Sequence, residues 1–194
     1  MAGGAAMCGF NFFPPTPRSI SVGEAAALMA LVPDGVTTVA VVVDAEDSLL
    51  ADIIDTAGVQ MLQLHGHESV ERVVEIREKF GLPVMNVLPV ASAGDVAAAR
   101  TYEPHVDRLM FDAKPPKGAT RPGGNALAFD WELLSGESWS VPWTLAGGLT
   151  AENVADAVKT SGTQAVDTAS GVEDAPGVKN PAKIRDFLDV VKSL

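Results

Sequence analysis

Short runs of apolar residues alternate with amphipathic segments along almost the whole chain. The runs are rich in Val, Met and Leu, and most of them are continuous instead of alternating with polar residues. Continuous apolar runs of this length are typical of strands that are buried on both faces, as in a parallel sheet. The pattern predicts seven strands, at residues 8–13, 37–43, 61–65, 83–90, 108–111, 143–146 and 165–167.

Segments with helical spacing lie between these runs. The clearest is at the C-terminus, where Pro181 suits the first turn of a helix. Its apolar positions are Ile184, Phe187, Leu188, Val191 and Leu194. Two further helices are predicted from the apolar positions of residues 49–57 and 70–80. The predicted N-caps are Ser21, Ser69 and Thr150.

The alternation of strands and helices predicts β/α units with right-handed crossovers. An open doubly wound sheet and a closed (β/α)8 barrel both satisfy this pattern. No G-x-G-x-x-G motif follows the first strand, which argues against the dinucleotide-binding form of the open sheet. Seven strands are one fewer than the barrel needs, and a barrel lacking one strand would expose two sheet edges.

Composition limits the partners of this chain. Its 194 residues are 47% hydrophobic and carry a formal net charge of −11, which predicts one globular domain over residues 1–194. An acidic surface repels phosphodiester backbones and anionic lipids, so neither nucleic acid nor a membrane is an expected partner. Only a local basic pocket could bind a phosphate. The single cysteine, Cys8, excludes an internal disulfide and a multi-Cys zinc site.

No apolar stretch reaches the length of a membrane span, and the first residues do not have the basic and apolar regions of a secretory signal. We therefore expect a soluble cytoplasmic protein.

Candidate chemistry is expected at the carboxyl ends of the strands, where the loops of a parallel β/α fold converge. The groups at these positions are Arg18, Asp44, His65, Asp112, the pair Gly147-Gly148 and residues 167–172. Asp112 precedes the one long loop, residues 113–128, which is rich in Gly and Pro. Desolvation there would suit Asp112 to general acid catalysis, although it could also simply bind loop amides. With Glu46 and Asp47, Asp44 is expected to start the next helix instead.

Three further features have both a functional and a structural interpretation. His65 and His67 are close in sequence, but alternate residues of an extended segment point to opposite sides, so His65 is predicted to line a pocket without a metal. Arg18 could bind a carboxylate or remain a solvated surface residue. Two successive glycine turns, Gly147-Gly148 and Ser170-Gly171, could present free N–H groups to a phosphate or serve only as tight turns.

Six segments, in order, resemble one family, phosphoribosylanthranilate isomerase. The segments are GFNFFPPTPRSIS (residues 9–21), QLHG (63–66), FDAK (111–114), GGNALAFDW (123–131), LAGGLTAEN (145–153) and VDTASGVE (166–173) with PGVK (176–179). The last two are the most specific. They cover nearly the whole chain, so agreement of all six by chance is very improbable.

The resemblance implies a single-domain (β/α)8 TIM-type barrel of tryptophan biosynthesis. Such an enzyme isomerises N-(5-phosphoribosyl)anthranilate to the 1-deoxyribulose product by an Amadori rearrangement, with a phosphosugar substrate and no metal or organic cofactor. It assigns the general acid to Asp112 and the group near the anthranilate carboxylate to Arg18. It places Asp167 near the ribose and His65 at the pocket wall. The phosphate loops that it implies contain Gly147, Gly148, Ser170 and Gly171.

Two departures from the family pattern matter. Residues 123–126, Gly-Gly-Asn-Ala, replace the usual Gly-Gly-Thr-Gly. The family's opening strand, of the type Lys-x-Cys-Gly, and its first helix have no counterpart, so the resemblance begins at the second strand. This accounts for seven strands and removes the cysteine that acts as the base. Cys8 is not expected to replace it, because it lies about 15 Å from the carboxyl end of its strand. A buried apolar role is expected for Cys8.

Three hypotheses follow. The chain is an isomerase of this family from which the first β/α unit is missing. Alternatively, it is a catalytically inactive relic that binds the ligand, or an interaction module that borrows a strand from a partner. The third hypothesis is another phosphosugar isomerase on the same barrel, since a fold does not fix a function. Exposed edges would favour association, with no particular oligomer indicated.

Overall fold

The centre of the computed structural model, which describes residues 4–114 and 128–194, is a parallel sheet of six strands. These are β1 (Met7–Asn11), β2 (Thr37–Val42), β3 (Met61–Leu64), β4 (Val84–Val90), β5 (Arg108–Ala113) and β6 (Trp143–Leu145). Residues 123–126, where the family pattern is broken, lie outside the described residues.

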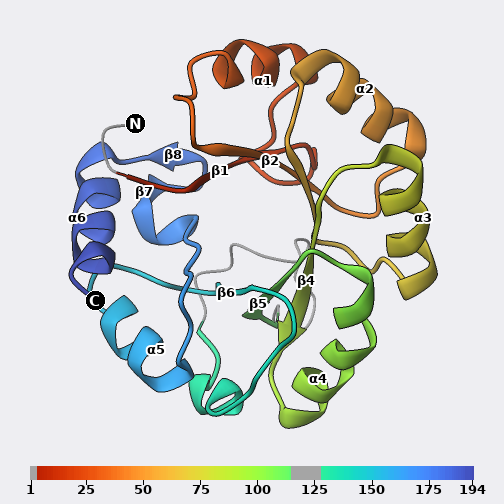
Figure 1. The fold of residues 1–194 in the computed structure, drawn as a ribbon. Coiled ribbons are helices and arrows are strands. Elements are labelled where there is room, and N and C mark those ends of the chain that lie inside the picture. The colour runs from red at the N-terminus through yellow and green to blue at the C-terminus, as the bar shows by residue number, and fades with distance from the viewer. Residues whose placement is uncertain (1–3, 115–127) are drawn as a thin grey trace.

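The strands pair in the order in which they follow one another along the chain. Every crossover therefore moves one place in the same direction, whereas a doubly wound sheet reverses direction at its switch point. When right-handed crossovers all advance in the same direction, the helices lie on one face of the sheet and the sheet curls. Figure 1 shows the helices as a ring around the strands. The sheet is thus a curled, barrel-like one, and the open doubly wound alternative is wrong.

Six α-helices connect or follow the described strands. They are α1 (Val22–Met29), α2 (Asp47–Ala57), α3 (Val70–Phe80), α4 (Ala93–Ala98), α5 (Val154–Ser161) and α6 (Pro181–Lys192). Ser21 and Ser69 cap α1 and α3 as predicted, each accepting a backbone N–H with its hydroxyl. Pro181 occupies the first turn of α6, also as predicted. None of the helices in the described residues is long and apolar enough to cross a membrane.

Two predicted helix starts are wrong. Asn153, not Thr150, is at the N-cap of α5, because the Asn153 side chain accepts the Thr150 N–H at 2.8 Å and closes a turn before the helix begins. Asp44 does not start α2, which begins at Asp47. Asp44 has a left-handed backbone, with φ of 46°, and its side chain binds the neighbouring loop instead.

The seventh predicted strand, residues 165–167, is reduced to one bridge between Leu145 and Val166. It pairs with β6 only, and the Thr168 hydroxyl then donates to the Leu149 carbonyl at 2.7 Å, where the chain has already entered the next turn. The structure adds an antiparallel hairpin that the pattern did not predict, β7 (Glu173–Ala175) with β8 (Val178–Lys179). Figure 1 shows this hairpin beside β1.

Alternation along the strands separates two apolar clusters. The larger lies between the sheet and the helices and includes Leu109 and Phe111 of β5. The smaller contains Val39, Met85, Val87, Met110 and Ala146. Because successive side chains of a strand point to opposite faces, Met110 and Asp112 face the inside of the curled sheet when Leu109 and Phe111 face the helices.

Phe111→Ala is expected to lower the free energy of unfolding by about 3–5 kcal/mol. The Phe111 side chain is fully buried, and its ring centroid lies 5.1 Å from that of Trp139 and 5.6 Å from that of Trp143. Urea denaturation measures the change. Leu31→Ala is the control, because Leu31 is 77% exposed and should lose less than about 0.5 kcal/mol. Equal losses would show that Phe111 is not part of the core.

Candidate functional site

The carboxyl ends of the strands form a bowl that contains Asp112. Asp112 is 6% exposed, and its Oδ1 accepts the N–H of Ala113 at 2.8 Å. A Cβ atom added to Gly147 would lie 2.6 Å from the Ala113 nitrogen and 3.0 Å from Asp112 Oδ1. The turn after β6 therefore passes directly against Asp112, and only a glycine, here with φ of 91°, fits at that point.

The second glycine turn packs against the first. A Cβ atom on Gly171 would overlap the Leu149 carbonyl oxygen, which also accepts a hydrogen bond from Thr168. The predicted phosphate loops are thus brought into contact, and Asp112 lies beside the one that contains Gly147.

The turns also offer free donors. In the described part of the chain, the backbone N–H groups of Gly147 and Gly148 donate to no protein acceptor. Ser170 begins a short 3-10 helix, Ser170–Val172, and the first N–H groups of a helix have no partner within it. N–H groups that converge from two such turns suit an anion, as in the phosphate sites of barrels.

His65 faces Asp112 across the bowl. Its Nε2 lies 3.2 Å from Asp112 Oδ2, without the alignment of a hydrogen bond, and has no hydrogen-bond partner among residues 4–114 and 128–194. The amide nitrogen of Gln63 lies 3.2 Å from His65 Nδ1. With the Gln63 amide oriented in this way, Nδ1 accepts, so a neutral imidazole carries its proton on Nε2, facing Asp112 and the bowl.

Asp167 contributes a second carboxyl group. The residue as a whole is exposed, but protein atoms surround its carboxyl group. The surrounding protein displaces water and raises the pKa of Asp167, and the nearby negative charge of Asp112 raises it further. His65 and Lys179 act in the opposite direction. The bowl therefore contains an imidazole and two carboxyl groups, and ionisation of Asp167 is disfavoured.

Arg18 is not a solvated surface residue. Its Nε and Nη2 donate to Glu173 Oε1 at 2.8 Å and Oε2 at 2.6 Å, which is a bidentate ion pair. The Arg18 side chain is 13% exposed and that of Glu173 3% exposed. Lys179 Nζ also lies 3.0 Å from Glu173 Oε1 and donates to the carbonyl of Ala169 at 2.7 Å. Two cations thus share one carboxylate, next to the turn that contains Ser170.

These contacts change the acidity of Glu173. Burial alone would raise its pKa, but the hydrogen bonds from Arg18 and Lys179 and the two positive charges outweigh burial and lower the pKa from 4.5 to about 2. The carboxylate is therefore ionised throughout the neutral range, and the cluster of three side chains keeps one net positive charge.

Sequence reasoning assigned no role to Glu173, Lys179 or Gln63, although all three lie in the segments that carry the family resemblance. The signal for Gln63 was its place two residues before His65 on one strand. No local signal identified Glu173, because Arg18 is 155 residues away along the chain.

Asp44 does not point into the bowl. Its Oδ1 accepts the His67 N–H at 2.7 Å, and its own N–H donates to Glu68 Oε1 at 2.8 Å. The second oxygen of Glu68 accepts the Gly66 N–H at 2.9 Å. Burial raises the pKa of Glu68, while these hydrogen bonds lower it. The two carboxylates therefore tie together the loops after β2 and β3, and this positions the loop that follows His65.

A cavity of about 480 Å³ lies beside these loops, at the N-termini of α2 and α3. Two of its charged groups are already paired with each other, since Arg72 contacts Asp47 at 2.6 Å, and Arg72 also donates to the Ala45 carbonyl at 3.0 Å. In the parts of the chain that the structure describes, no group of three or more His, Cys, Asp or Glu side chains is placed to hold a metal ion.

Cys8 lies on β1 and packs against the larger apolar cluster. Burial raises the pKa of its thiol, so the thiolate is disfavoured. The residue is only partly buried, against the core and not within it, and these surroundings do not favour a base.

Comparisons with known proteins identify the family of this chain. A family model described as "N-(5'phosphoribosyl)anthranilate (PRA) isomerase" matches residues 1–190. The N-(5'-phosphoribosyl)anthranilate isomerase of Paramagnetospirillum magneticum is 52% identical over 189 residues, covering 97% of this chain and 88% of the relative. The enzyme of the same name from Cereibacter sphaeroides is 51% identical, with 97% and 89% coverage.

Solved structures show the same similarity. Phosphoribosyl anthranilate isomerase from Thermotoga maritima matches with a TM-score of 0.88 and 31% identity, over 100% of this chain and 91% of the other. A phosphoribosyl anthranilate isomerase in complex with reduced 1-(o-carboxyphenylamino)-1-deoxyribulose 5-phosphate matches with a TM-score of 0.82 and 28% identity, over 100% and 90%.

Gly147→Ala is expected to destabilise the protein more than Gly136→Ala. Both glycines have positive φ, 91° and 74°, but an added Cβ meets no atom within 4 Å at Gly136. The left-handed backbone alone should cost Gly136→Ala about 1–2 kcal/mol. Gly147→Ala should lose more, because its methyl group also displaces the Ala113 backbone. Urea denaturation compares the two, and equal losses would contradict the close approach.

The stability of the protein is expected to fall as Glu173 is protonated. A carboxyl whose pKa is lowered by folding stabilises the fold fully above its unfolded pKa, and this contribution is lost as the pH falls through the folded value. For Glu173 the window runs from pH 4.5 down to about 2. The free energy of unfolding should decrease more steeply there in the wild type than in Glu173→Gln. Parallel curves would show that the ion pairs do not stabilise the fold.

Proposed function

The chain belongs to the N-(5'-phosphoribosyl)anthranilate isomerase family, and we propose that it converts N-(5-phosphoribosyl)anthranilate to 1-(2-carboxyphenylamino)-1-deoxyribulose 5-phosphate in tryptophan biosynthesis. The single observation that carries this proposal is the position of Asp112, buried in the bowl against the first of two glycine turns in contact with each other. This arrangement supports a proton donor beside the proposed phosphate site.

The two ends of the substrate have matching groups. Its phosphate suits the N–H groups of Gly147, Gly148, Ser170 and Gly171. Its anthranilate carboxylate suits the free edge of the Arg18 guanidinium, because Glu173 occupies only Nε and one hydrogen of Nη2. A ligand held at both ends would lay its ribose across Asp112, Asp167 and His65. The relative with a bound reduced deoxyribulose phosphate supports a phosphosugar ligand of this class.

Asp112 is proposed as the general acid. It transfers its proton to the furanose ring oxygen as the bond between that oxygen and C1′ breaks. The anthranilate nitrogen supplies the electron pair that forms a C1′=N bond. The raised pKa of Asp167 favours a proton on that neighbouring carboxyl group, within the same bowl as the proposed acid. His65 lines the wall and orients Asp112.

The second step removes the C2′ proton and gives an enolamine. Tautomerisation then places a carbonyl at C2′ and a second hydrogen at C1′, so no oxidant or metal is consumed. The family resemblance implies that a cysteine removes this proton. That cysteine lies on the strand before the one that corresponds to β1. Within residues 4–114 and 128–194, the only cysteine is Cys8, whose core packing does not suit that role.

The architecture proposed for the bowl is an eight-stranded barrel in a single domain. The sequential strand order and the bridge beyond β6 support it. Apart from one bridge between Asn11 and Ser19, β1 pairs with β2 alone in the described part of the chain. One more strand between β1 and residues 165–167 would close the barrel, and the base would belong to that strand. A small, soluble substrate fits the expected cytoplasmic location.

Incubation with N-(5-phosphoribosyl)anthranilate of the protein that includes the strand proposed to carry the base tests the function directly. Asp112→Asn should lower kcat by about 10²–10⁴-fold, because the amide is too weak an acid to transfer a proton to the ring oxygen, and should leave ligand binding almost unchanged. Asp107→Asn is the matched control. Asp107 lies at the opposite end of β5 and binds Arg77 and the Val84 N–H, so its loss should lower stability without a comparable effect on kcat.

Three results would contradict the proposal. Equal kcat for Asp112→Asn and the wild type would remove Asp112 as the acid. Binding of the substrate by the wild type with no turnover would favour an inactive ligand-binding protein. Turnover of a plain phosphosugar at the same rate would favour a different isomerase of the same fold.

A further inference from the structure

Glu173 is the buried partner of Arg18, and no step of the proposed reaction uses its carboxylate. We propose that Glu173 is a positioning residue, which fixes the Arg18 guanidinium to receive the anthranilate carboxylate and couples it to the phosphate turn. The inference rests on the proposed function, and it adds a specificity determinant to that site.

The first argument is the geometry of the ion pair. Glu173 binds Nε and Nη2 of Arg18 in a bidentate manner, with both oxygens used. This leaves Nη1 and the outer hydrogen of Nη2 directed away from Glu173, and these are the donors that a second carboxylate can bind in the same way. Nη1 donates to no protein group in the described residues.

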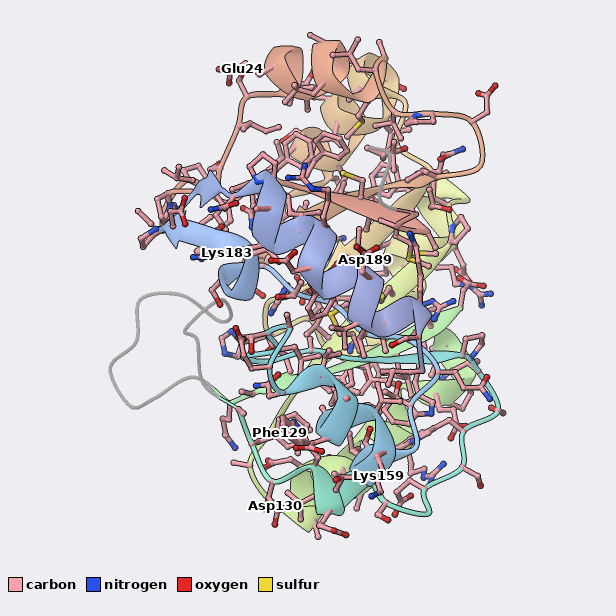
Figure 2. All side chains as sticks on the ribbon, turned by 90° about the vertical axis from the view of Figure 1, so that its left-hand side faces the viewer. Glu24, Phe129, Asp130, Lys159, Lys183 and Asp189 are labelled. Carbon is pink, nitrogen blue, oxygen red and sulfur yellow. The ribbon has the colours of Figure 1, made fainter. Side chains whose placement is uncertain are left out.

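The second argument is that the backbone on both sides is already fixed. The loop of Arg18 is closed by hydrogen bonds from Thr16 N–H to the Phe13 carbonyl at 3.0 Å and from Ser19 N–H to the Thr16 carbonyl at 3.1 Å. Glu173 is held by β8 and by Lys183 Nζ, which donates to its carbonyl at 2.7 Å. Figure 2 shows Lys183 on α6 next to the hairpin. The Glu173 side chain is therefore free to orient Arg18 rather than to hold the loop.

The third argument is the path to the phosphate turn. Glu173 contacts Lys179, and Lys179 donates to the Ala169 carbonyl, one residue before Ser170. At the hairpin tip, a Cβ on Gly177 would lie 2.7 Å from the Pro17 carbonyl oxygen, directly before Arg18. The position of Arg18 is thus fixed relative to the turn that receives the other end of the substrate.

A charge-conserving change separates orientation from charge. Glu173→Asp keeps the negative charge but is one methylene shorter, so both oxygens cannot reach Arg18 from the same backbone. Arg18 would then have to be ordered by the ligand. We expect the Kd for reduced 1-(o-carboxyphenylamino)-1-deoxyribulose 5-phosphate to rise about tenfold, the upper range for ordering one long side chain. A control ligand carries a phenylamino group in place of the carboxyphenylamino group and so has no carboxylate. Its Kd for Glu173→Asp should stay within about twofold of the wild-type value.

Asp174→Glu is the matched control. Asp174 is the next residue of the hairpin, is exposed, and pairs with Lys183 and Asn180 instead of Arg18. This change also conserves charge and alters length by one methylene, and it should leave both Kd values unchanged. Urea denaturation of each variant verifies that it is folded. In an Arg18→Ala background, Glu173→Asp should have no further effect on either ligand.

The outcomes distinguish the inference from the function on which it rests. If the wild type does not prefer the carboxylated ligand, both the proposed substrate and the role of Glu173 are overturned. If the wild type has that preference and Glu173→Asp retains it, only the inference fails. Equal weakening of both ligands by Glu173→Asp would show a structural role alone and would overturn the inference, as would additive effects of Arg18→Ala and Glu173→Asp.

Discussion

The site depends on one constraint, which is the parallel pairing of all six strands in chain order. Because the strands run in one direction, the side chains that follow each of them meet on one side of the sheet. Because the crossovers all move the same way, the sheet curls and these side chains face one another. Residues as distant in sequence as Arg18 and Glu173, or His65 and Asp112, come within hydrogen-bond or ion-pair distance for this reason.

The fold was predictable where a pattern is repeated and local. Runs of apolar residues located six of the strands, and serine caps or helical spacing located α1, α2, α3 and α6. The seventh strand was not separable from its neighbours by sequence, since residues 165–167 have the apolar character of a strand but form only a single bridge, between Val166 and Leu145. The short hairpin after Ser170 contains only five strand residues, too few for a periodic signal.

The site was predictable as a set of positions but not as a set of contacts. The rule that strand ends carry the chemistry selected Asp112, His65 and the glycine turns, and these come together. The same rule selected Asp44, which binds the adjacent loop because its left-handed backbone directs it there. Sequence alone also left a solvated Arg18 as one of two interpretations. Its burial depends on Glu173, and nothing near either residue along the chain indicates the other.

The crowded glycine turns also restrict how this protein could acquire a new substrate. At Gly147 and Gly171 any added side chain would overlap neighbouring backbone atoms, so natural variation has almost no room to reshape the end of the bowl that they form. The opposite end is built from long side chains, and these can be exchanged without moving the main chain. Divergence within such a scaffold would therefore preserve the grip on one end of a metabolite while the chemical group accepted at the other end changes.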